Sequence, residues 1–219
     1  PEMSIDLTEP SGYSPLPVEL KWSSTGIIDH YEVYVDGQFK KYLASMTKSY
    51  RLTDATDGNH TVVVYAYDPL VKSANDSMIF SVDNTASTIG IPSRTPEGDI
   101  LPDQTVKVSV NVTDTVSGVK NVTLSYTVNN GTSWTNLTMN LNSSTGLYEA
   151  TIPGQPAATW VKYKIIAYDN AENPAIKDGT QPYCMYQVIP EFSSALILPL
   201  LMALTIIAVI SAKRKKLYL

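Results

Sequence analysis

Residues 106–113 read VKVSVNVT, and this stretch decides the fold class. Its valines occupy every second position, with a polar residue between each pair. Successive side chains of a β-strand point to opposite faces, so this period of two predicts a half-buried strand. Two further runs have the same period: Leu124, Tyr126 and Val128, and then Tyr163, Ile165 and Ala167. This part of the chain is therefore expected to form an all-β domain.

The N-terminal part of the chain repeats the same order of features. Its alternating runs are Val18, Leu20 and Trp22, then Tyr31, Val33 and Val35, then Val62, Val64 and Ala66. A hairpin signal follows the middle run in each copy, Asp36-Gly37 in the first and Asn130-Gly131 in the second. The third run ends in AYDP at 66–69 and in AYDN at 167–170. We therefore expect a duplicated domain, with Trp22 central to the first core and Tyr126 with Tyr163 central to the second.

Composition agrees with β structure and excludes several classes of protein. The chain has 219 residues, 14 Tyr against 3 Phe, and no extended helical pattern. Its net charge is -5 and its basic residues form no stripe outside the C-terminus, so nucleic acid is not an expected partner. Cys184 has no cysteine partner, and only His30 and His60 accompany it as nitrogen or sulfur ligands. With no catalytic or phosphate-binding motif either, we expect no enzyme, no cofactor and no metal.

Three segments resemble the immunoglobulin-like or fibronectin type III-like repeats of archaeal cell-surface proteins: SGVKNVTLSYTVNNGTSW at 117–134, GLYEATIPG at 146–154 and VKYKIIAYDNAENPA at 161–175. The resemblance implies two tandem β-sandwiches, which we place at 1–83 and 89–188, joined by a linker at 84–88. The antibody-type cysteine pair is absent, so hydrophobic packing alone must hold each sandwich.

The C-terminus carries an apolar run, ALILPLLMALTIIAVISA, at 195–212. Its 18 uncharged residues would span about 27 Å as a helix, close to the thickness of the hydrocarbon core of a bilayer. The basic cluster Lys213, Arg214, Lys215 and Lys216 follows directly, in a tail at 213–219. The positive-inside rule then predicts a single transmembrane helix with its N-terminal side outside the cell and membrane lipid as a partner.

A short motif, Pro190-Glu191-Phe192, lies just before this run, in the juxtamembrane segment 189–194. Motif, apolar helix and basic cluster together resemble the PEF-CTERM class of archaeal sorting signals. That resemblance implies recognition by an archaeosortase, which would cut near the motif and replace the helix by a lipid anchor. The alternative is a permanent single-pass anchor in which the motif occurs by chance.

Seven N-x-[ST] sequons favour a glycosylated exterior. They begin at Asn59, Asn75, Asn111, Asn121, Asn130, Asn136 and Asn142. The alternative is that Asn and Thr are simply common in exposed strands and turns. Four of the seven lie close together around the second hairpin signal, where sugar would shield one face.

Two clusters of side chains are candidates for binding. If Val33 and Val64 point inward, then Tyr34, Tyr65 and Tyr67 form an exposed patch that suits stacking on a sugar or docking a neighbouring protein. Ordinary packing between strands explains the same pattern, and is the favoured interpretation. Oxygen atoms for calcium are offered by Asp114, Asp169, Asn170, Glu172 and Asn173, but turn chemistry explains these residues equally and is favoured.

The function predicted from the sequence is that of a structural or adhesive module on the cell surface, held by a C-terminal anchor. Because export is required and residue 1 is Pro, we expect the chain to be a fragment of a longer precursor. Two alternatives remain open: the accessory region of a surface protease or glycoside hydrolase, and a polysaccharide-binding module.

Overall fold

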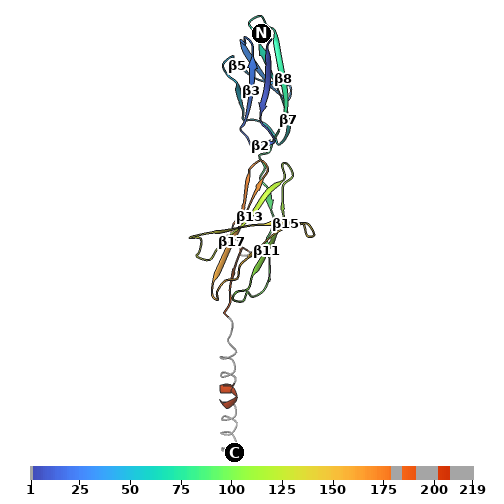
Figure 1. Cartoon of the computed structure of the whole chain (residues 1–219). Helices are drawn as coiled ribbons and strands as arrows, with labels where there is room; N and C mark the ends of the chain where they lie inside the picture. Colours follow the sequence, from blue (N-terminus) through green and yellow to red (C-terminus); the bar gives the residue numbers. More distant parts are fainter. Residues whose placement is uncertain (1, 179–183, 191–201, 208–219) are drawn as a thin grey trace, which may run out of the picture.

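A computed structural model describes residues 2–178, 184–190 and 202–207 of the chain. Two β-sandwiches follow one another along a long axis, and the chain leaves the second at the end that faces away from the first (Figure 1). The prediction of a fold dominated by β structure is confirmed, since the described part is mostly β-strand.

The N-terminal sandwich packs a smaller sheet on a larger one. The smaller sheet has the order β1 (Ser4–Glu9), β3 (Val18–Thr25), β6 (Ser49–Leu52). The larger has the order β2 (Tyr13–Ser14), β8 (Ser73–Val82), β7 (Gly58–Tyr67), β4 (His30–Val35), β5 (Gln38–Ala44). Chain neighbours such as β3 and β4, or β6 and β7, lie in different sheets. This interleaving is the arrangement of an immunoglobulin-like sandwich.

The C-terminal sandwich repeats the same plan. One sheet has the order β10 (Ser93–Thr95), β11 (Val106–Val110), β16 (Leu147–Ile152), β15 (Asn140–Asn142). The other has the order β14 (Thr135–Thr138), β13 (Val119–Thr127), β17 (Trp160–Asp169), β18 (Pro174–Lys177), with β19 (Met185–Gln187) also paired to β17. A short pair, β9 (Thr88–Ile89) with β12 (Val112–Thr113), lies at the start of this sandwich.

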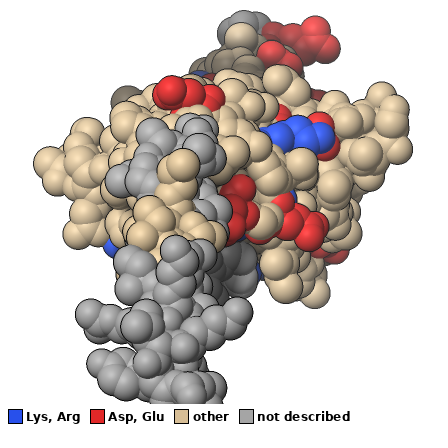
Figure 2. Space-filling model, turned by 90° about the horizontal axis from the view of Figure 1, so that it is seen from below, with Lys and Arg blue, Asp and Glu red and all other residues tan. Residues whose placement is uncertain are grey.

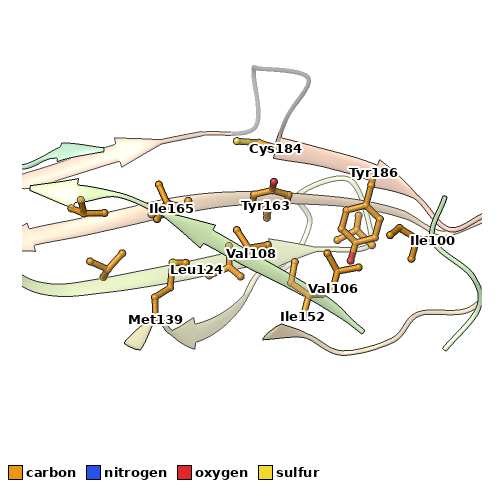
Figure 3. Packing of buried hydrophobic residues seen from close by; sticks show 14 of the residues in the cluster. Ile100, Val106, Val108, Leu124, Met139, Ile152, Tyr163, Ile165, Cys184 and Tyr186 are labelled. Carbon is orange, nitrogen blue, oxygen red and sulfur yellow. The ribbon is translucent and has the colours of Figure 1, made fainter. Parts of the chain in front are cut away.

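Each sandwich has its own hydrophobic core. In the first, Trp22 is 4% exposed and packs edge-on against Tyr31, with ring centroids 5.4 Å apart. In the second, Figure 3 shows Tyr163 and Ile165 of β17 facing the side chains of the opposite sheet. Cys184 is buried at the edge of this core, and burial raises the pKa of its thiol to about 11. Because no disulfide joins the sheets of either sandwich, burial of the alternating valines and aromatic residues stabilises each one.

One detail of the second core differs from the expectation. Tyr163 is fully buried as predicted, but Tyr126 is half-buried at the margin of the cluster and Val128 is exposed. The reason is that β13 ends at Thr127, whose Oγ1 accepts a hydrogen bond from Gly131 N at 3.0 Å. The chain therefore turns out of the sheet before Val128 reaches the core.

The connection between the sandwiches is held to the N-terminal one by hydrogen bonds. β8 ends at Val82 and β9 begins at Thr88. Asp57 accepts hydrogen bonds from Thr85 Oγ1 and, at 2.7 Å, from Asn84 N, and these contacts hold the pKa of its carboxyl below the ordinary value. Asn84 Oδ1 in turn accepts from Leu16 N at 2.8 Å. The first part of the connection therefore continues the N-terminal sandwich.

The membrane segment expected at 195–212 lies mostly outside the described residues. Residues 202–207 are helical. Among the described residues no helix has both the length and the apolar character that crossing a membrane requires. The basic cluster Lys213 to Lys216 also lies outside the described part, as do Glu191 and Phe192, whereas Pro190 is described and exposed.

Candidate functional site

The outer face of the larger N-terminal sheet gathers the tyrosines that the sequence singled out. Val33 on β4 and Val64 on β7 are fully buried, so the residues next to each of them along its strand face outward. Tyr34, Tyr65 and Tyr67 are each partly exposed. The Tyr34 and Tyr65 ring centroids are 5.6 Å apart, and those of Tyr65 and Tyr67 are 6.3 Å apart. The three rings therefore form one continuous patch across two strands.

The structure extends this patch onto β5, which the sequence reasoning missed. Phe39 and Tyr42 are both exposed, and their ring centroids lie 4.7 Å apart. Phe39 also contacts Tyr34 at 5.6 Å, while His30 stacks on Tyr67 at 4.8 Å. A signal was available, because both β5 aromatics follow the Asp36-Gly37 turn and a hairpin places them beside β4.

We call the six residues His30, Tyr34, Phe39, Tyr42, Tyr65 and Tyr67 the aromatic face. The carboxylate of Glu32 lies among them and accepts hydrogen bonds from Tyr34 Oη at 2.9 Å and from Tyr67 Oη at 3.4 Å. The hydrogen bond to Glu32 raises the pKa of Tyr34 and of Tyr42, so these hydroxyls stay protonated donors. A hollow of about 460 Å³ opens beside Tyr34, Tyr65 and Tyr67. Flat rings beside polar hydroxyls suit stacking on a sugar ring.

A second cluster lies where the two sandwiches meet. The carboxylates of Asp83, Asp114 and Asp169 come together, with one oxygen of each within 4.8 Å of the others. They come from the end of β8, the turn after β12 and the end of β17. Asp83 and Asp169 are 0% exposed. We call these three residues the junction cluster.

The structure brings together only part of the predicted oxygen set. Of the five residues proposed from the sequence, Asp114 and Asp169 belong to the junction cluster. The other three act as supports: Asn170 Nδ2 donates to Ser117 O at 2.8 Å, Glu172 forms an ion pair with Lys120, and Asn173 Nδ2 donates to Asp169 Oδ2 at 2.8 Å. Asp83 was missed, because nothing local to its sequence relates it to turns 30 to 90 residues further along.

The predicted glycosylation positions are mostly accessible. Asn59, Asn75, Asn111, Asn121, Asn130 and Asn136 are exposed. Asn142 is half-buried, and its Nδ2, the atom that would carry a sugar, donates to Glu149 Oε2 at 3.2 Å. Attachment of a sugar at Asn142 would therefore break this hydrogen bond to Glu149, which the other six asparagines do not make.

Charge on the visible surface follows the composition. Figure 2 views the described part from its C-terminal end, where acidic side chains are spread over the face and basic ones gather into no stripe.

Comparisons with known proteins give structural resemblance without a family. No family model matches the chain, and no curated protein matches it. Among solved structures, fibronectin(III)-like modules of CbhA from Clostridium thermocellum are 12% identical over 85% of this chain and 94% of that chain, with a TM-score of 0.48. A marsupial T cell receptor is 11% identical over 87% and 74%, with a TM-score of 0.49. A bacterial ice-binding adhesin is 15% identical over 86% and 64%, with a TM-score of 0.42.

Proposed function

We propose that the chain is a non-enzymatic stalk or interaction module of a cell-surface protein, held at the membrane by its C-terminal segment. The observation that carries this proposal is the order of parts after the last strand. β19 ends at Gln187, and the sequence then runs into the apolar segment 195–212 and four consecutive basic residues. Since the chain leaves the C-terminal sandwich at the end away from the N-terminal one, an anchor there would raise both sandwiches outward from the membrane (Figure 1).

The orientation can be tested through the basic cluster. Replacing Lys213, Arg214, Lys215 and Lys216 with Gln should weaken the positive-inside bias, so that part of the population inserts with the sandwiches inside. Protease protection of intact cells measures this fraction. The matched control replaces four exposed lysines of the sandwiches and should leave the orientation unchanged. The proposal is contradicted if the sandwiches lie entirely outside the cell in both variants. It is also contradicted if the wild-type chain is recovered only in the soluble fraction and none with the membrane.

We further propose that Pro190-Glu191-Phe192 marks a processing site at which an archaeosortase exchanges the helix for a lipid. Mass spectrometry of the protein from its native membrane distinguishes the two anchors. A lipid-modified C-terminus near the motif supports processing. Good recovery of the intact peptide through Leu219 contradicts it and leaves a permanent transmembrane anchor.

The aromatic face favours a second candidate function, binding of a surface polysaccharide. Its six rings are contiguous and carry hydroxyl donors at their edge, which is the chemistry that sugar stacking uses. Affinity electrophoresis in gels containing neutral polysaccharide tests this. Tyr65→Ala and Tyr42→Ala should each weaken retardation by about two- to tenfold. Tyr168→Ala in the C-terminal sandwich is the matched control, and equal behaviour of all three variants would refute the candidate.

A further inference from the structure

Three carboxylates meet at the junction cluster without a neutralising cation from the protein. Across the described residues, no Lys, Arg or His forms an ion pair with Asp83, Asp114 or Asp169. Asp83 and Asp169 are shielded from water, where repulsion between like charges is screened least. Burying ionised carboxylates without a counter-charge is costly, so this arrangement calls for a positive partner.

Backbone donors orient these carboxylates but leave their charge in place. Ser117 N donates to Asp83 Oδ2 at 3.1 Å and to Asp114 Oδ1 at 3.0 Å, and Asn173 N donates to Asp169 Oδ1 at 2.8 Å. The same short segments thus fix all three side chains toward one point. Such preorganisation is what a binding site requires, and a set of solvated surface acids lacks it.

A separate observation at this place points to a ligand. Ser87 is 5% exposed, and its Oγ has no hydrogen-bond partner. The β9 and β12 register ends with Thr88 opposite Thr113, and its continuation by one residue would set Ser87 across from Asp114. Directly opposite residues of an antiparallel pair extend to the same face, so we infer that the Ser87 hydroxyl faces the carboxylate side. The Oγ of Ser117, whose N–H already contacts two of the carboxylates, is likewise buried without a partner.

We propose that Asp83, Asp114 and Asp169 bind one calcium ion, with the hydroxyls of Ser87 and Ser117 beside it. All the donors are oxygens, as hard cations require, and calcium is held at 2.3–2.6 Å by six to eight of them. Oxygens on opposite sides of calcium are therefore about 4.6–5.2 Å apart. The three carboxylate oxygens, all within 4.8 Å of one another, fit around one such ion. Water or backbone carbonyls would complete its coordination.

The ion would join the two sandwiches. Asp83 N donates to Ser14 O at 3.1 Å, which continues the pairing of β8 with β2 and fixes this residue to the N-terminal sandwich. Asp114 and Asp169 belong to the C-terminal sandwich. Without the ion, repulsion among the three carboxylates pushes the sandwiches apart. One direct contact across the junction remains, in which Asn173 Nδ2 donates to Asp83 O at 2.9 Å. Calcium therefore stiffens the junction. The value of a stiff junction to a stalk rests on the proposed function, whereas calcium binding itself does not.

Calorimetric titration of the chelator-treated full chain in detergent tests the site. We expect one calcium ion per chain, with a dissociation constant of about 10⁻⁴–10⁻³ M, and at least about tenfold weaker binding of magnesium. Asp169→Asn should weaken calcium binding by at least about tenfold. Asp99→Asn removes one exposed acid of the same sandwich and should bind as the wild type does. Absence of saturable calcium binding to the folded wild-type chain, or full binding by Asp169→Asn, overturns the proposal.

A second variant guards against a folding defect. Asp114 is only half-buried, so Asp114→Asn keeps the fold more readily and should show the same loss of calcium affinity. Small-angle scattering with and without calcium then measures the junction. A narrower distribution of maximum dimensions with calcium, in wild type and Asp99→Asn but not in Asp114→Asn, is the expected result. Calcium binding without any change in this distribution would overturn the stiffening role alone, and leaves the anchor proposal to its own test.

Discussion

Removing the indole of Trp22 tests the assignment of the first core. The side chain is 4% exposed, and its Nε1 has no hydrogen-bond partner, so Trp22→Ala removes apolar burial and the edge-on contact with Tyr31 but no hydrogen bond. Burial of a ring this size, about 150–250 Å², at about 25 cal/mol per Å² corresponds to about 4–6 kcal/mol as an upper value. We therefore expect the free energy of unfolding of the N-terminal sandwich to fall by about 3–5 kcal/mol.

Urea unfolding of the full chain in detergent, followed by far-UV circular dichroism, measures this loss. Because the two cores are separate clusters, the transition of the C-terminal sandwich should not move. Trp160→Ala is the matched control, since Trp160 is 51% exposed and its removal should cost less than about 1 kcal/mol. A loss below about 1 kcal/mol for Trp22→Ala would refute the reasoning, because it would mean that the ring contributes no more than a surface residue.

Two further predictions concern backbone packing and pH. A Cβ on Gly154 would lie 2.2 Å from the carbonyl oxygen of Asp103, so Gly154→Ala should destabilise the C-terminal sandwich by about 1–3 kcal/mol, whereas Gly98→Ala, with open space around it, should change the urea midpoint little. Burial lowers the pKa of His60, but hydrogen bonds to Asp36 Oδ2 and to a backbone carbonyl, both at 2.7 Å, outweigh it and raise the pKa above 6.5. The stability that this pair contributes is complete below pH 6.5 and is lost as pH rises through the folded-state pKa of His60. In His60→Gln the urea midpoint should not show this decline. Parallel pH profiles of the urea midpoint in wild type and variant would contradict the assignment. On the acid side, hydrogen bonding to His60 holds the pKa of Asp36 below its ordinary value, so the same stability is present above pH 3.8 and falls as pH drops through that lowered pKa.

Local pattern was enough to give the phase of the main strands. Val33 and Val64 face the core because alternation puts every second residue on one side, and a sandwich has only one dry side per sheet. The turn at Asp36-Gly37 follows equally directly, since both residues have positive φ, at 53° and 74°, the geometry that such a pair favours. Where the pattern gave a wrong result, at Val128, the strand had already ended, and the end of a strand depends on turn hydrogen bonds that periodicity does not contain.

The full extent of the aromatic face depends on the pairing of β5 with β4, which alternation within a single strand does not show. Phe39 and Tyr42 lie on β5, whose residues alternate poorly because it is the edge strand of its sheet and is wet on more than one side. Their contact with Tyr34 follows from the pairing of β5 with β4, including the irregular register between Val33 and Tyr34.

The sequence by itself determined that the chain is a duplicated, mainly β protein with an apolar C-terminal segment, because these properties are written in periods of two residues and in one uninterrupted apolar run. It left Asp114 and Asp169 as ordinary turn residues and gave no role to Asp83. Only the folded chain decides that the three carboxylates meet. Asp83 and Asp114 each follow a strand by one residue, and Asp169 is the last residue of β17. Their meeting depends on how the end of β8 is set against two segments of the next sandwich that are distant from it in the chain.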